Sequence, residues 1–359
     1  MLRKILLTAL FCLMPFMYAH AQRTSVGSIL RGIISAVSSQ EKTENSSQTQ
    51  EAASRAQTSS SESERYYQAG LSYLEEAEKK IKDENSGREE VTQYVKQSAI
   101  SFERAAKLGH IKAQYELGRL YYLNYDLFPD DGNGYYTTVI KASIFWLEQA
   151  AKSKYTKAQY ELGNLYYTLC SDFSFGSNFS PKYDGSEAIK FMKISIQWLE
   201  LAAKSGEKEA YILLGKIYFD YAEDARLNKC LSYSWFSQDI VQGDAVAQLY
   251  LGRIFEEGKC TPSRRADYKQ AFELYTKSHQ QGNYDALSAI AQMYARGRYV
   301  SKDLKKAFQL SLQAAEGSAE AVCYVSEAYA NGLGVKRNQR KAQEWESKCI
   351  EASEMEAGI

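Results

Sequence analysis

This 359-residue chain is poor in histidine, the side chain widely used for acid–base catalysis and metal binding. It has three histidines, and the two that follow residue 21, His110 and His279, lie far apart in the sequence. Zinc-protease, P-loop and nucleophile-elbow motifs, which set ligands, nucleophiles or phosphate-binding glycines at fixed spacings, do not occur. We interpret both histidines as helix-end residues and expect no enzymatic activity, no catalytic residue, no metal site and no cofactor.

The first 21 residues have the pattern of a secretory signal peptide. Arg3 and Lys4 precede an uncharged run, and Ala19-His20-Ala21 places small residues where signal peptidase needs them. The uncharged run of 17 residues is shorter than the roughly 20 that span a bilayer. We predict a signal peptide over 1–21 and an exported protein, periplasmic or secreted, without a spanning segment after the leader is removed. A leader retained as an anchor is the alternative.

The charge balance argues against nucleic acid or an anionic membrane as a partner. Lys and Arg together number 44, as do Asp and Glu, so the formal net charge is zero. No overall basic excess is available to neutralise phosphates. The chain also has only four prolines, and so few helix-breaking residues favour a mostly helical protein.

Residues 22–64 divide into an amphipathic segment and a polar one. Within 25–39, apolar residues spaced three and one apart fall on one helical face: Val26, Ile29, Leu30, Ile33, Ile34 and Val37. Residues 38–64 contain three alanines and no larger apolar side chain, so we predict a disordered linker that protease cleaves easily. Segment 25–39 either folds back on the repeats or frays, or it docks on a partner or a membrane surface.

From residue 65 onward the chain repeats one helical pattern. An alanine is followed four residues later by an aliphatic residue and eight residues later by an aromatic one, beginning at Ala113, Ala158, Ala210, Ala247, Ala286 and Ala321. These positions share one helical face. A second helical segment follows each of them, and Asp267, Asp303 and Asn338 fit N-caps for the later ones. We predict an all-α array of about six to seven antiparallel helix pairs over 65–352, then a C-terminal tail, 353–359.

A small residue recurs inside the first helix of every unit. In the first four full units it is a glycine, at Gly118, Gly163, Gly215 and Gly252. A glycine in a helix interior costs about 1 kcal/mol relative to alanine. Four glycines at one register therefore predict that a second helix crosses very close at that point.

The last unit reads Ala328-Tyr329-Ala330-Asn331-Gly332-Leu333-Gly334-Val335, followed by Asn338, Lys341, Ala342 and Trp345. Together with the five units before it, this pattern resembles the Sel-one-like repeat (SLR) family, which is related to the tetratricopeptide repeats. The resemblance covers about residues 113–350. It implies a right-handed α/α superhelical solenoid that binds other proteins, commonly as an adaptor, and it brings no catalytic residues.

The resemblance also bears on the five cysteines after the leader. Some secreted members of the family carry disulfides between the two helices of a repeat, which implies a pair between Cys323 and Cys349. Two buried thiols are the alternative. Cys170 with Cys230 is a weaker candidate pair, and an odd number of cysteines leaves at least one outside an intramolecular disulfide.

Positions two, six and nine after the repeated alanine form a second stripe, on first helices that line the concave side of such arrays. In the first three full units the stripe is largely aromatic: Tyr115, Tyr122, Tyr160, Tyr167 and Phe219. Tyrosine gives a large contact area at low entropic cost, so we predict that a protein partner binds these residues, near the long loops 124–137 and 169–186. Alternatively, the rings fill space between repeats.

We therefore predict a non-enzymatic interaction scaffold or adaptor of the cell envelope or exterior, with a protein partner of unknown identity in the concave groove. One alternative function is a carbohydrate- or peptidoglycan-binding repeat protein that uses the tyrosine-rich groove. A hydrolase built on the repeats is the other, although the sequence contains no nucleophile–base pair or metal cluster to support it.

Overall fold

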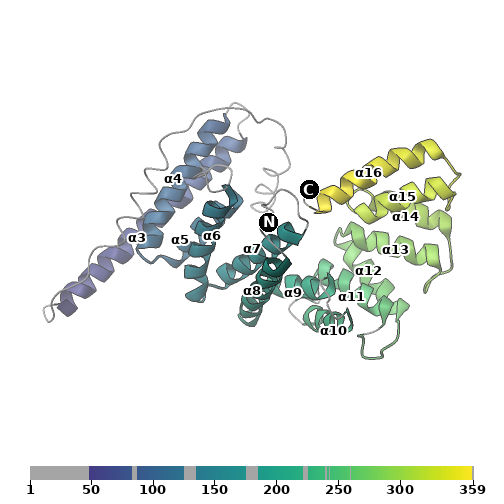
Figure 1. The fold of residues 1–359 in the computed structure, drawn as a ribbon, viewed down its shortest axis with the longest axis horizontal. Helices are drawn as coiled ribbons and strands as arrows, with labels where there is room; N and C mark the ends of the chain where they lie inside the picture. The colour runs from purple at the N-terminus through teal and green to yellow at the C-terminus, as the bar shows by residue number, and fades with distance from the viewer. Residues whose placement is uncertain are drawn as a thin grey trace. The chain divides into compact units, whose positions relative to one another are not determined.

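The computed structural model describes residues 48–82, 87–124, 135–174, 185–220, 225–238, 241, 243–258 and 260–357. Within these ranges there are fourteen α-helices, α3 to α16, and no strand (Figure 1). The predicted leader and the amphipathic segment 25–39 lie outside the described residues, and so do residues 38–47 of the predicted linker.

The helices follow one another as antiparallel pairs, which confirms the predicted all-α solenoid architecture. Seven pairs occur in the described part of the chain. They are α3 (Gln48–Lys82) with α4 (Arg88–Lys107), α5 (Ile111–Leu123) with α6 (Tyr135–Lys152), α7 (Thr156–Ser174) with α8 (Gly185–Lys204), α9 (Lys208–Asp220) with α10 (Ala225–Phe236), α11 (Ala245–Glu257) with α12 (Tyr268–Gln280), α13 (Tyr284–Arg296) with α14 (Leu304–Ala314), and α15 (Ala319–Asn331) with α16 (Gln339–Ala357).

The chain forms two compact units, and the boundary between Phe145 and Trp146 falls inside α6. Unit 1 contains α3, α4, α5 and the start of α6, and the fully buried Phe102 of α4 packs beside Gly70 of α3. Unit 2 contains the end of α6 and α7 to α16. Its core is a series of clusters, each built from neighbouring helices, such as Leu199, Leu214 and Ile217 of α8 and α9. The aliphatic position of the repeat pattern is thus the core position.

Within the pairs, the two helices cross at the predicted glycines. A Cβ atom at Gly163 would lie 2.7 Å from Leu199 Cγ, and one at Gly215 would lie 2.5 Å from Phe236 Cζ. Gly252 meets Tyr275 at a similar distance. Since real Cβ atoms do not approach other atoms so closely, the predicted close crossing is confirmed at these three glycines.

A buried serine of the second helix recurs at the crossings. Its hydroxyl donates a hydrogen bond to the carbonyl oxygen of the small residue on the first helix. The four glycine pairs are Ser98 to Gly70 at 2.9 Å, Ser143 to Gly118 at 2.7 Å, Ser195 to Gly163 at 2.7 Å, and Ser232 to Gly215 at 2.8 Å. Each serine is therefore buried with its hydroxyl satisfied, as a buried polar group requires.

Three predicted boundaries are wrong. Residues 48–64, predicted to be disordered, form the first half of α3, and Ser63 there is buried. The predicted loop 169–186 is shorter than expected, because α7 continues to Ser174 and α8 begins at Gly185. The predicted tail 353–359 is helical to Ala357. In α3 and α16 most residues are Glu, Gln, Arg, Lys or Ala, which have high helix propensity even where no apolar stripe marks the helix.

In the last three pairs the turn between the helices follows one plan. The first helix ends at a glycine with left-handed φ: Gly258 (72°), Gly297 (67°) and Gly332 (75°). The next helix begins after a polar residue whose side-chain oxygen accepts a backbone N–H: Asp267, Asp303 and Asn338. The predicted N-caps are thus confirmed, and they fix where each second helix starts.

Candidate interaction surface

In unit 2 the first helices of successive pairs contact one another. α7 contacts α9, α9 contacts α11, and α13 contacts α15. We use the name first-helix face for the exposed and half-buried residues of these helices that the following paragraphs describe, Tyr160, Tyr167, Phe219, Arg253, Gln292 and Glu320. The predicted aromatic stripe of unit 2 belongs to it.

Tyr160 and Tyr167 of α7 are half-buried, and they pack against the cluster of α8 and α9 that contains Leu214. Phe219 of α9 is also half-buried; its ring lies edge-on to Tyr250 of α11, with centroids 5.0 Å apart. The ammonium of Lys229 lies 5.0 Å from the same ring. One side of each ring thus fills space between repeats, and the remainder is accessible to solvent.

The two predicted partner-binding residues in unit 1, Tyr115 and Tyr122, differ in burial. Tyr115 of α5 is only 6% exposed, and the Arg119 guanidinium one turn later lies 5.4 Å from its ring centroid. The prediction of a partner-binding role is therefore wrong for Tyr115, since a buried ring offers no contact area. Tyr122, at the end of α5, is half-buried.

The chemistry of the tyrosines on the first-helix face is that of neutral hydroxyls. Burial raises the pKa of Tyr160 well above its usual value, and the nearby carboxylates of Glu161 and Glu209 raise it further. Its hydroxyl therefore keeps its proton at neutral pH. It can donate a hydrogen bond to a partner, but it cannot act as a general base there.

Further along unit 2 the face becomes polar. Gln292 Nε2 of α13 donates to Glu320 Oε1 of α15 at 2.7 Å. The guanidinium of Arg253, on α11, lies 3.8 Å from the other Glu320 oxygen. Side chains of three first helices are therefore joined across the repeats, and this part of the face is charged where the α7–α9 part is aromatic.

Both histidines lie at helix ends, as predicted. His110 is the N-cap of α5: its Nδ1 accepts from the Ala113 N–H at 3.1 Å, and Nε2 lies 3.0 Å from Glu64 Oε2. His279 lies in the last turn of α12 with Nδ1 buried. An open hollow of about 610 Å³ beside His110 has a largely polar lining. No group of three metal-ligating side chains occurs among the described residues.

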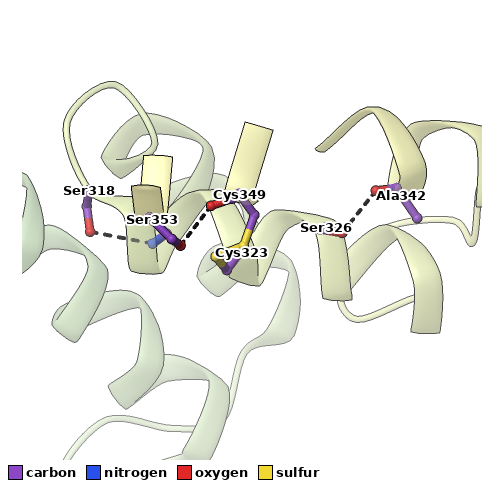
Figure 2. The surroundings of a disulfide bond; sticks show 7 residues. Ser318, Cys323, Ser326, Ala342, Cys349 and Ser353 are labelled. Carbon is purple, nitrogen blue, oxygen red and sulfur yellow. Dashed lines mark hydrogen bonds between the residues drawn. A yellow bond between two sulfur atoms is a disulfide. The ribbon is translucent and has the colours of Figure 1, made fainter. Parts of the chain in front are cut away.

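The predicted disulfide between Cys323 and Cys349 is present and joins α15 to α16 (Figure 2). The second pairing was predicted wrongly: Cys230 of α10 bonds to Cys260, with Cα atoms 4.8 Å apart, and Cys170 is buried in α7. The turn after α11 folds back beside α10, which the spacing of cysteines in the sequence does not reveal. This second bond links two successive helix pairs.

These features define an α/α solenoid of helix pairs with a repeated Gly–Ser crossing. The chain belongs to the Sel1 repeat family, whose signature matches more than half of it, at residues 111–155, 156–196, 192–207, 245–283, 285–318 and 319–346. Helices α9 and α10 lie entirely outside these matches, yet Ser232 and Gly215 form the same hydrogen bond. Sel1 repeats commonly serve as protein-interaction scaffolds and are generally not catalytic.

Solved structures with a similar arrangement include a Sel1 repeat protein from Oxalobacter formigenes, with 20% identity, a TM-score of 0.47, and coverage of 73% of this chain and 98% of that one. A protective antigen of uropathogenic Escherichia coli with an SLR fold shows 22% identity and a TM-score of 0.41, over 84% of this chain and 64% of that one. A putative Sel1 repeat protein from Klebsiella pneumoniae shows 18% identity and a TM-score of 0.34, over 64% of this chain and 98% of that one. No curated protein sequence shows significant similarity to this chain.

Proposed function

We propose that this protein is an exported, non-enzymatic scaffold that binds a protein partner on the first-helix face of unit 2. The partner contacts Tyr160, Tyr167 and Phe219. The polar part of the face, around Arg253 and Glu320, orients it.

The observation that carries this proposal is the partial burial of the three aromatic rings. Each is held on one side by the next repeat and remains partly accessible on the other. A ring held in this way loses little conformational entropy when a partner covers it, and such preorganised aromatic residues dominate the energetics of protein interfaces.

Export is supported by the leader pattern of the sequence and by the two disulfides. Disulfides form and persist mainly in oxidising compartments outside the cytoplasm. No described helix is long and apolar enough to cross a membrane. The leader pattern and the two disulfides support our proposal that the scaffold works in the periplasm or outside the cell.

Site-specific photo-crosslinking in cells tests the proposal. A photoreactive amino acid that replaces Tyr167 should crosslink to a single partner protein. The same photoreactive amino acid in place of Gln197, which is exposed on the second helix α8, should give no such crosslink. Tyr160→Ala should weaken formation of the Tyr167 crosslink at least tenfold while circular dichroism remains unchanged. Equal crosslinking from both positions, or no effect of Tyr160→Ala in a folded protein, would place the partner elsewhere.

A further inference from the structure

The net charge of zero conceals a strong local separation of charge in the last three helix pairs. The three turns that join first to second helices cover residues 260–270, 296–306 and 332–341, and we call them together the basic edge. They hold three, five and four basic residues against one, one and no acidic residue. In contrast, residues 307–331 hold three acidic residues and no basic one.

The three turns lie side by side. A Cβ atom at Gly334 would lie 1.9 Å from the carbonyl oxygen of Leu304, so the last turn packs directly on the start of α14. The Arg298 guanidinium lies 5.4 Å from the Tyr268 ring centroid, which brings the middle turn against the start of α12. The basic residues of the three turns therefore form one continuous row.

Most of this charge is not neutralised within the protein. Arg296 and Arg298 pair with Glu256, and Lys306 lies over the Tyr294 ring. Arg340 pairs with Glu344. Eight further basic residues are exposed and make no ion pair with a described residue: Arg264, Arg265, Lys269, Lys302, Lys305, Lys336, Arg337 and Lys341. Such a row of like charges raises the local potential and attracts an anionic surface.

An exposed aromatic ring lies in the middle of the row. Tyr299 is 53% exposed and has a φ of 63°, a left-handed conformation that disfavours a tyrosine. The last turn has Gly334, with a φ of 72°, at the same place in its sequence pattern. Glycine fits this backbone without strain, whereas the tyrosine is strained there, and its ring lies 5.5 Å from that of Phe272 while much of it stays exposed.

We infer that the basic edge binds the surface of a bilayer that contains anionic phospholipids. The exposed side chains form an open row, and a plane of closely spaced headgroup charges matches it along its length. Tyrosine is enriched at membrane interfaces, where its ring meets the acyl boundary and its hydroxyl remains in water. The inference rests on none of the three rings Tyr160, Tyr167 and Phe219, so it is independent of the proposed function.

Vesicle sedimentation with the purified full chain tests the inference. The protein should bind vesicles of phosphatidylglycerol with phosphatidylcholine, should not bind pure phosphatidylcholine, and should be released by about 0.5 M salt as screening takes effect. Each basic residue near an anionic surface contributes about fivefold in partitioning. The triple variant Lys302→Gln, Lys305→Gln, Lys336→Gln should therefore lose at least tenfold in binding.

A matched variant provides the control. Lys193→Gln, Lys204→Gln and Lys277→Gln remove the same charge from exposed positions off the basic edge, and should change binding less than twofold. Tyr299→Gly should fold normally and weaken vesicle binding several-fold with an unchanged salt dependence. The inference is overturned if both triple variants lose binding equally or neither does, since segment 25–39 or overall charge would then be responsible. Stronger binding to polyglutamate than to anionic vesicles would also overturn it, in favour of an acidic protein.

Discussion

At the scale of single residues, the repeated crossing of the helices depends on a glycine in the first helix and a small polar residue, serine, in the second. Glycine on the first helix removes the Cβ atom, so the second helix can approach its backbone. Serine on the second helix is small enough to fit there, and its hydroxyl bonds to the glycine carbonyl, as Ser195 does with Gly163. This hydrogen bond contributes roughly 1 kcal/mol to stability, enough to offset the helix-propensity cost of the glycine.

The substitution Gly163→Leu should destabilise unit 2 by roughly 1–3 kcal/mol, because the new side chain overpacks the crossing. The backbone nitrogen of Leu199 would lie 3.2 Å from the added Cβ, so the clash cannot be relieved by a side-chain rotation alone. Urea unfolding followed by circular dichroism measures the loss.

Gly243→Leu is the control for this variant. Gly243 lies in the turn before α11, is exposed, and has nothing within 4 Å of an added Cβ. This control should unfold close to the wild type. If both leucine variants lost the same free energy of unfolding in urea, the explanation that Gly163 permits a close helix approach would be wrong.

The sequence predicts the glycine of each crossing but not its serine partner. Four glycines at one helical register contradict helix propensity, and that contradiction makes them visible. Ser143 and Ser195, by contrast, read as ordinary residues between apolar neighbours. The burial of Tyr115 was not predicted either, because the position of a residue on a helix does not reveal which neighbouring elements cover its side chain.

At the scale of elements, the last helix depends on the disulfide that attaches it. α16 has mostly exposed, charged residues, and its buried contact is limited to a few residues such as Ala342 and half-buried Trp345. Cys349 ties its middle to Cys323 of α15, and Ser326 donates to the Ala342 carbonyl at 2.9 Å (Figure 2). The crosslink thus compensates for a small hydrophobic contact.

Replacing Cys349 by serine should therefore loosen α16 selectively. For cysteines 26 residues apart, the loss of the crosslink costs roughly 3 kcal/mol of stability. Hydrogen–deuterium exchange should become faster throughout α16, with α7 to α9 unchanged.

The double variant Cys323→Ser, Cys349→Ser should exchange like the single one, because either substitution breaks the same bond. Peptide mapping without reduction should first recover the Cys230–Cys260 and Cys323–Cys349 peptides. Protection of α16 that survives both substitutions would show that packing alone holds this helix.

Helix positions were predictable wherever apolar periodicity marks them, as in α5, α7 and α13. The first half of α3 was not, since it has no apolar stripe and its composition also fits a disordered linker. The Cys230–Cys260 bond was likewise beyond the sequence, because it depends on the path of the turn after α11. The periodicity of apolar residues thus predicts where helices form, whereas the path of the turns decides which distant residues come into contact.

At the scale of the whole molecule, half-buried and fully buried tyrosines make the free energy of unfolding depend on pH in the alkaline range. Burial raises the pKa of Tyr121, Tyr160 and Tyr275 above the usual value of about 10. Above that pH the unfolded chain releases protons that the folded protein retains. The free energy of unfolding should therefore fall as pH rises from about 10 toward the folded pKa values.

Urea unfolding at several values between pH 8 and pH 11 measures this dependence. Tyr275 is fully buried, and its hydroxyl donates to Glu256 at 3.0 Å. Tyr275→Phe should make the decline shallower by about 1.4 kcal/mol per pH unit, the contribution of one proton. A stability that did not change between pH 9 and pH 11 would contradict the assignment of these tyrosines as protonated in the folded protein.

The two disulfides also determine how the array responds to mechanical force. A pull on the C-terminus first draws out the residues after Cys349, and the bond then transfers the load directly to Cys323 in α15, so the residues between the two cysteines are bypassed. The bridged residues would span about 90 Å if extended, and that length is never released. Cys230–Cys260, with a separation of 30, withholds about 105 Å in the same way. Held between two anchored partners, unit 2 would lengthen in fewer and shorter steps than an array without crosslinks.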